Sequence, residues 1–353
     1  MVVHPRPWGP DCNLSSGVLS VTAKPQLLGL TLGDPAGIGP EICAKMLAQP
    51  DLPERPLVLG DPEVLHLAAK RLGLELALQS VDHPGAPVPE GTISVLSTGP
   101  AAASVTLGQV SKIAGKAAFG AIKAGIDYSM SGALAGIITA PINKEAFAAA
   151  NIPFPGHTEM LAHYAKADVA MMLANSAIRT VLTTIHVPLR QAVDLITREN
   201  VLRAIRLAHH GAVALGYSDP RVAVAGLNPH AGEGRLFGDE DADEILPAIE
   251  DAKAEGIIAS GPWPGDTVFM SARQGAFDVV VAQYHDQGLI PVKYMGLADG
   301  VNITLGLPFV RTSPDHGTAF DIAGQGIADP ASLRTAFNYA LQLRDAAMGM
   351  VQL

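Results

Sequence analysis

The sequence is poor in cysteine, in positive charge and in long apolar runs, and each shortage excludes a class of protein. Cys12 and Cys43 are its two cysteines, too few for a disulfide framework or a thiolate metal cluster. The formal net charge is −10, and the 24 Lys and Arg residues are scattered along the chain. We therefore expect no nucleic-acid partner and no anionic-membrane partner. No apolar run approaches the roughly 18 residues needed to cross a bilayer.

Apolar and small residues are abundant. The 353 residues are 48% hydrophobic and 16% charged, with 36 Gly and 27 Pro, a composition typical of a loop-rich α/β enzyme. A chain of this length is expected to form two domains. Residues 1–25 lack a charged segment followed by an apolar one, so they do not resemble a signal peptide. We expect them to form a mobile N-terminal extension of a cytoplasmic protein.

Short apolar runs alternate with helical patterns along the chain. This alternation predicts an α/β fold with a mainly parallel sheet and helices on both faces. The stretch GDPAGIGPE follows the first predicted strand, and its Gly37 and Gly39 resemble a dinucleotide-binding loop only loosely, because Ile42 stands at the third glycine position. A tight strand-to-helix turn explains this spacing equally well. The predicted strands are 26–31, 56–59, 92–96, 135–139, 180–185, 221–227 and 279–281.

Three histidines occupy equivalent positions. His186 follows VLTTI, His230 follows VAVAGLNP and His285 follows VVVAQY, so each lies just past the carboxyl end of a predicted strand. Ligands in open α/β sheets bind at such ends. The spacings are too wide for a local zinc motif, but adjacent strands or a dimer interface would bring the three together as a divalent-metal site. The alternative is that each histidine caps a strand.

Other polar residues are candidates for binding a substrate. Lys293 and Arg311 are either substrate cations or solvated surface groups. The pair His157-Thr158 precedes a predicted helix, where it would bind an anion or cap the helix. Asp266 lies in a loop rich in Pro and Gly, where a turn role is the simplest explanation.

The chain resembles the 4-hydroxythreonine-4-phosphate dehydrogenase family of vitamin B6 biosynthesis. The motifs GDPAGIGPE, PGHTE, HVPL, NPHAGE, YHDQG and DHGTAFDIAG occur in that order, and the resemblance runs from Leu27 to the C-terminus. It implies a two-domain α/β/α fold like that of isocitrate and isopropylmalate dehydrogenases. The expected domains are a cofactor-side domain (26–140 plus 305–353) and a metal, substrate and dimerisation domain (141–304).

The resemblance also implies roles for particular residues. It implies a divalent metal (zinc, magnesium or cobalt), NAD or NADP as cofactor, a phosphorylated hydroxy acid as substrate, and a homodimer whose subunits share the active site. The implied metal ligands are His186, His230 and His285. The implied substrate-binding residues are His157, Thr158, Lys293, Asn302 and Arg311. Asp266 and Lys293 are the candidate catalytic residues, and the sequence leaves open which of them is the base. The implied cofactor-binding residues are His316, Gly317, Asp321 and Gly324.

The implied reaction is oxidation of the C3 hydroxyl of 4-phosphohydroxy-L-threonine, followed by decarboxylation. One departure opens alternatives, because Asn143 in PINKEA stands where members of this family often have His. PINKEA also resembles a branch that acts on 4-phospho-D-threonate or 4-phospho-D-erythronate. Less favoured alternatives are a dihydrodiol dehydrogenase, which needs no phosphate site, and a metabolite-binding protein without catalysis.

Overall fold

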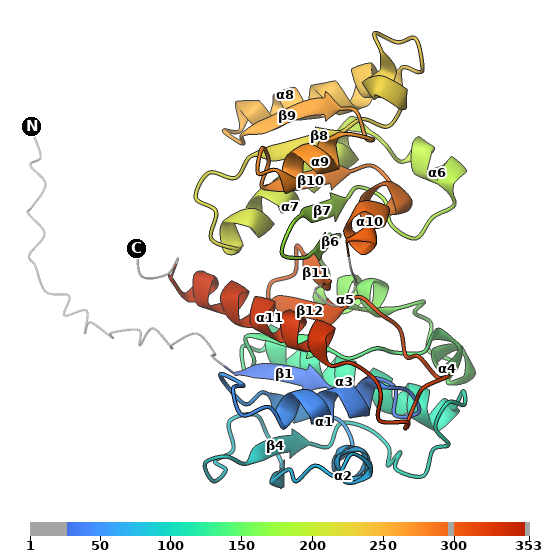
Figure 1. Ribbon diagram of the computed structural model, residues 1–353, viewed down its shortest axis with the longest axis vertical. Helices are drawn as coiled ribbons and strands as arrows, with labels where there is room; N and C mark the ends of the chain where they lie inside the picture. The colour runs from blue at the N-terminus through green and yellow to red at the C-terminus, as the bar shows by residue number, and fades with distance from the viewer. Residues whose placement is uncertain (1–26, 296–299, 350–353) are drawn as a thin grey trace, which may run out of the picture.

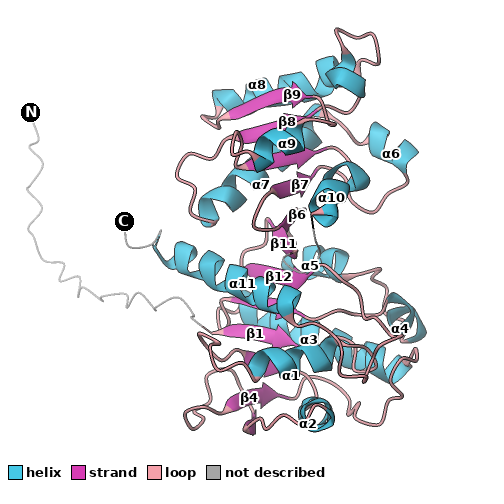
Figure 2. Cartoon of the chain, in the orientation of Figure 1, coloured by secondary structure: helices cyan, strands magenta, loops and turns pink. Residues whose placement is uncertain are grey.

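A computed structural model describes residues 27–295 and 300–349, so the expected N-terminal extension lies outside the described residues. Within these ranges the strands form one twelve-stranded sheet with helices on both faces (Figure 1; Figure 2). The prediction of an α/β fold with a mainly parallel sheet is confirmed.

The strands are β1 (Leu28–Thr31), β2 (Leu57–Leu59), β3 (Leu78–Val81), β4 (Ile93–Leu96), β5 (Gly136–Thr139), β6 (Ala170–Ala174), β7 (Arg179–Leu182), β8 (Val222–Ala225), β9 (Ala259–Trp263), β10 (Val279–Ala282), β11 (Val301–Leu305) and β12 (Val310–Pro314). The helices are α1 (Gly39–Leu47), α2 (Pro62–Arg71), α3 (Lys112–Met130), α4 (Lys144–Ala149), α5 (His157–Ala165), α6 (Leu189–Asp194), α7 (Arg198–Ala214), α8 (Leu246–Ala254), α9 (Val268–Arg273), α10 (His285–Tyr294) and α11 (Ala331–Gly349). Short turns of 3-10 and π type span Pro229–Gly232 and Asp241–Ile245.

The order of strands across the sheet is β3-β4-β2-β1-β5-β12-β11-β6-β7-β10-β8-β9. Parallel pairing joins β3 through β12 on one side and β7 through β9 on the other, while β11 and β6 pair antiparallel with their neighbours. The two parallel groups therefore run in opposite directions along the ladder. Each strand is also rotated by about 20–25° from the next, so the reversal and the accumulated twist together bring carboxyl ends from both groups to one cavity.

The helices form two layers around the sheet. Strand residues of one face pack with α1, α2, α7, α8 and α11 in one continuous apolar cluster. On the other face α3, α4 and α5 cover the first strand group, while α9 and α10 cover the second. The β10 residues Val279, Val280 and Val281 are fully buried because β10 has helices on both sides.

The expected boundary between residues 304 and 305 falls at the end of β11. Strand β11 is hydrogen-bonded to β12, which belongs to the other expected domain. Helices α4 and α5, which fall in the expected second domain, pack against α3 beside the first strand group. The division itself stays a prediction.

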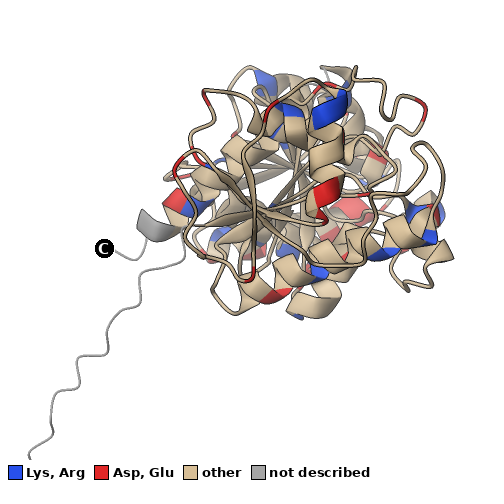
Figure 3. Ribbon diagram, turned by 90° about the horizontal axis from the view of Figure 1, so that it is seen from below, with Lys and Arg blue, Asp and Glu red and all other residues tan. Residues whose placement is uncertain are grey.

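Charged residues of both signs are interspersed over the helices seen from below (Figure 3). Among the helices of residues 27–295 and 300–349, none combines the length and apolar character needed to cross a bilayer.

Candidate active site

A cavity of about 360 Å³ lies beyond the carboxyl ends of β5 and β12, between α5 and α10. It collects most of the residues singled out in the sequence, although they come from both halves of the sheet. The predicted residues that line it are His157, Thr158, His186, His285, Lys293, Asn302, Arg311, His316 and Gly317.

Arg311 is the largest polar side chain in the cavity wall, and it is 2% exposed. Its Nη1 donates a hydrogen bond to Thr304 Oγ1 at 2.9 Å and its Nη2 to Thr139 Oγ1 at 2.8 Å. Its Nε is buried and has no partner within the described residues. Burial lowers the pKa of Arg311 to about 9. Among the described residues this buried guanidinium is bonded to two hydroxyls and has no counter-charge, so the wall is suited to receive an anion.

Two neighbouring side chains also have unused hydrogen-bonding atoms. His157 Nε2 and Asn302 Oδ1 are buried without a partner in the described part of the chain. Burial, and then the charge of Arg311, hold the pKa of His157 well below its ordinary value, so the imidazole is neutral at pH 7. His157 begins α5, and Gly156 and Thr158 line the cavity beside it. The helix N-terminus therefore adds backbone donors to the anion site.

Lys293 reaches the same cavity from the last turn of α10. Its Nζ lies 3.2 Å from Oδ2 of Asp315, whose side chain is 11% exposed. Burial raises the pKa of Asp315, while the ammonium of Lys293 opposes that rise. Lys144, at the start of α4, supplies another cation to the wall.

His186 and His285 lie side by side, with ring centroids 5.9 Å apart. Each ring turns its Nδ1 toward a carboxylate: His186 toward Glu159 at 3.4 Å and His285 toward Asp286 at 2.7 Å. The contact with His186 lowers the pKa of Glu159. A carboxylate behind Nδ1 is the usual arrangement for a metal-binding histidine, because it orients the ring and directs Nε2 to the ion. The two imidazoles fit part of a divalent-metal site, which needs at least one more ligand.

His230 lies elsewhere in this chain, in a cavity of about 690 Å³ that Asp266 also lines. No group of three or more metal-binding side chains occurs within the described ranges. His230 adopts φ 52° in the left-handed region. Its loop is held by the buried Asp241, which accepts hydrogen bonds from the backbone N–H of Leu227 and Asn228 at 2.8 and 3.0 Å. The structure thus brings two of the three predicted ligands together and places the third in a different cavity, which Tyr284 and Asp286 also line.

The remaining predicted residues do not line the anion cavity. Asp321 is exposed, and Gly324 lines a small separate cavity with Gly37 and Glu41. Asn143 is the N-cap of α4, where its Oδ1 accepts a hydrogen bond from Ala146 N at 2.8 Å. Its side chain thus has a structural role that explains its presence.

Sequence reasoning did not single out Asp315, Glu159 or Lys144. Glu159 lies within PGHTE, and its position two residues after His157 was the available signal. Asp315 immediately precedes His316, but its pairing with Lys293 joins the loop after β12 to helix α10 and is visible only in the fold.

The fold and the cavity define an α/β protein that binds a small anionic molecule beside a candidate metal site. Residues 53–340 match the family model described as pyridoxal phosphate biosynthetic protein PdxA, and the chain belongs to this family.

Similar proteins agree with this placement. A protein of Beijerinckia indica named 4-hydroxythreonine-4-phosphate dehydrogenase is 59% identical over 90% of this chain and 95% of its own length. A protein of Cupriavidus necator named D-threonate 4-phosphate dehydrogenase is 44% identical over 90% and 97%. The crystal structure of 4-hydroxythreonine-4-phosphate dehydrogenase from Klebsiella pneumoniae is 42% identical, with a TM-score of 0.81, over 90% of this chain and 99% of that one.

Proposed function

We propose that this chain is a metal- and NAD(P)-dependent dehydrogenase that oxidises the C3 hydroxyl of 4-phosphohydroxy-L-threonine. The β-keto acid that forms then loses CO2. The observation that carries the proposal is the buried guanidinium of Arg311, which has no counter-charge among the described residues and lies beside a candidate metal site. The names of the relatives support an oxidoreductase acting on a CH–OH group of a phosphorylated substrate.

His186 and His285 would hold a divalent metal (zinc, magnesium or cobalt) together with a third histidine. When bound, such an ion polarises the substrate hydroxyl and lowers its pKa. His230 would complete the set from a partner subunit, because in its own chain it lines a different cavity from the other two histidines. The active site would then be shared in a homodimer.

A shared site has a consequence for Asp266. It lines the same cavity as His230, so a partner subunit that supplies one supplies the other. Lys293 and Asp266, the two candidates for the base that takes the hydroxyl proton, would then come from different subunits. Lys293 stands in the anion cavity of its own chain, beside Asp315.

The remaining side chains would bind and orient the substrate. Arg311, Lys293, His157 and Thr158 hold its charged ends, and Asn302 offers a free amide oxygen. NAD or NADP, when bound, would accept the hydride from C3, and the base would take the hydroxyl proton. The cofactor would bind along the loop that contains His316, Gly317, Asp321 and Gly324.

4-Phospho-D-threonate is the second candidate substrate, with 4-phospho-D-erythronate beside it. The 44% identical relative from Cupriavidus necator and the motif PINKEA favour it. The two classes of substrate differ at C2, which bears an amine in one and a hydroxyl in the other.

The test is NADH formation by metal-loaded protein with each of the three phosphorylated acids. The matched control is 4-hydroxy-L-threonine, which lacks the phosphate and should react far more slowly. We expect turnover with one phosphorylated acid, its loss on treatment with a chelator, and its return with added metal. Absence of NADH and NADPH formation with all three acids, although metal and dinucleotide bind, would refute the enzyme and favour a metabolite-binding protein.

A further inference from the structure

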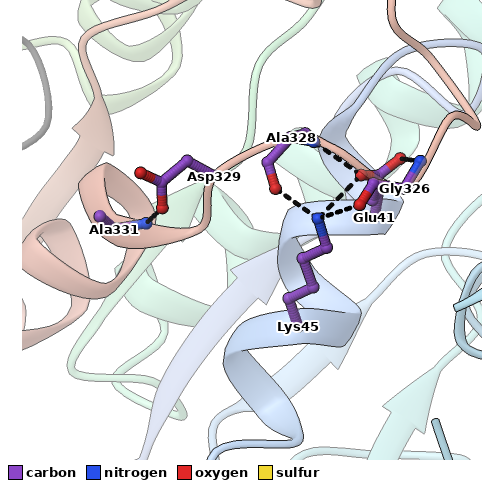
Figure 4. A network of polar contacts seen from close by, with 6 residues as sticks. All are labelled: Glu41, Lys45, Gly326, Ala328, Asp329 and Ala331. Carbon is purple, nitrogen blue, oxygen red and sulfur yellow. Dashed lines mark hydrogen bonds and ion pairs between the residues drawn. The ribbon is translucent and has the colours of Figure 1, made fainter.

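The loop that runs from His316 to Gly326 is fastened at its end by two side chains of α1 (Figure 4). Glu41 Oε2 accepts a hydrogen bond from Gly326 N at 3.2 Å, and its Oε1 accepts one from Ala328 N at 2.9 Å. Lys45 Nζ donates to the carbonyl oxygens of Gly326 at 2.9 Å and Ala328 at 2.5 Å. One acidic and one basic side chain thus bind the donors and acceptors of the same two residues.

Glu41 and Lys45 also bind each other, with Nζ 3.0 Å from Oε1. The Glu41 side chain is only 6% exposed, so removing either partner would leave the other poorly compensated. A largely buried ion pair contributes little net stability against its desolvation. Its contribution here is geometric, because it fixes the path of two residues that are distant from α1 in sequence.

The start of the loop is held by the same part of the chain. Ile38 N, at the beginning of α1, donates a hydrogen bond to Thr318 O at 3.0 Å. At Gly37 a Cβ atom would lie 2.9 Å from the Cβ and the carbonyl oxygen of Thr318, so this approach requires glycine. The segment 37–45 therefore fastens the loop near both ends by hydrogen bonds and by the close approach at Gly37.

We propose that Glu41 and Lys45 are positioning residues for the dinucleotide, acting through the loop that they fasten. This inference rests on the proposed function, which places the cofactor along His316–Gly324. A loop that is already ordered loses less conformational entropy when a ligand binds, so the pair increases affinity for the dinucleotide. Neither side chain lines the cavity of Arg311, so affinity for the phosphorylated acid should depend on them little.

The variants to test are Lys45→Met, Glu41→Gln and the double variant, with Lys45→Arg as the conservative exchange. The matched control is Lys123→Met, which breaks another ion pair with the same i,i+4 spacing, between Lys123 and Asp127 on α3. The measurements are the KM of each substrate, the dissociation constant of NADH by fluorescence, and hydrogen exchange of the backbone over 319–329 in cofactor-free protein.

We expect the KM for the dinucleotide and the dissociation constant of NADH to rise about tenfold in Lys45→Met and Glu41→Gln. The KM for the acid should change little, and exchange over 319–329 should quicken. Lys45→Arg should restore part of the affinity, and Lys123→Met should behave as wild type. Unchanged NADH affinity or unchanged exchange in both single variants would overturn the proposal.

These measurements distinguish a failure of the positioning proposal from a failure of the proposed function. If wild-type protein binds NADH but oxidises none of the acids, the proposed function fails, and weaker NADH binding by the variants still supports the positioning pair. If wild-type protein binds neither NADH nor NADPH, the positioning proposal is overturned as well.

Discussion

The ammonium of Lys293 lies 3.2 Å from the carboxylate of Asp315 at the wall of the anion cavity. The two residues come from the last turn of α10 and from the end of β12. Asp315 is also fixed by its backbone N–H, which donates to Ser332 Oγ at 3.3 Å. The carboxylate therefore gives a long, flexible lysine side chain one defined direction.

We predict that Asp315→Asn lowers kcat/KM by about tenfold to a hundredfold, because the ammonium of Lys293 is no longer held in place. Steady-state kinetics with the phosphorylated acid measure this loss. Asp239→Asn is the control, since that carboxylate pairs with Arg235 on an exposed surface. Wild-type kinetics in Asp315→Asn would show that Lys293 needs no partner.

Arg311 should favour substrate binding without stabilising the folded protein. Arg311→Met removes a buried charge that is bonded only to hydroxyls in the described residues. We expect the free energy of unfolding without ligand to stay level or rise, by on the order of 1 kcal/mol. We also expect kcat/KM to fall by at least about a hundredfold. Urea denaturation and kinetics on the same preparation test both parts, and a strongly destabilised variant would contradict the first.

A shared active site predicts complementation between inactive subunits. His186→Ala and His230→Ala should each be inactive as homodimers. Mixed after dissociation, they should recover about a quarter of the wild-type sites, because each heterodimer keeps one intact site. The control is a mixture of His186→Ala with Lys293→Ala, whose residues line one cavity of one chain. That mixture should stay inactive, and recovery only in the control would reverse the assignment of subunits.

The buried carboxyl of Asp34 should make the stability of the folded protein depend on pH. Burial raises the pKa of this carboxyl from 3.8 to about 6, although Ala36 N donates to it. The folded state holds the proton more tightly than the unfolded state, so this group lowers stability as pH rises from about 4 to 6. Asn cannot ionise, so Asp34→Asn should gain stability over wild type across that range.

The gain should level off above about pH 6, at roughly 3 kcal/mol. Urea denaturation of both proteins at several pH values measures the difference. A stability difference that is constant with pH would show that Asp34 has an ordinary pKa.

Seven strands lie where apolar runs indicated them, including β10 at Val279–Val281. Strand β6 was missed, although its sequence AMMLA is a continuous apolar run. Strand β12 was not predictable, because it carries the buried polar run Arg311-Thr312-Ser313, which has no apolar signature. Helix α10 contains Gly288 and Pro291, which disfavour a helix. It forms because Leu289 and Val292 are buried against the sheet.

The sequence indicated most residues of the candidate site, but it did not indicate how they are arranged in space. His186 and His285 follow neighbouring parallel strands, β7 and β10, which explains why they meet. His230 follows β8, the other neighbour of β10, yet its loop turns away through left-handed residues held by Asp241. Backbone conformations of that kind leave no periodic trace in a sequence.

The continuous sheet also has a mechanical consequence. Strands β11 and β12 are joined by a ladder that pairs Asn302 with Ser313, and Asn302 and Arg311 both project into the anion cavity from these strands. A change in the angle between the two groups of parallel strands would therefore twist this pair of strands. A ligand that contacts both Asn302 and Arg311 would therefore oppose a change in that angle.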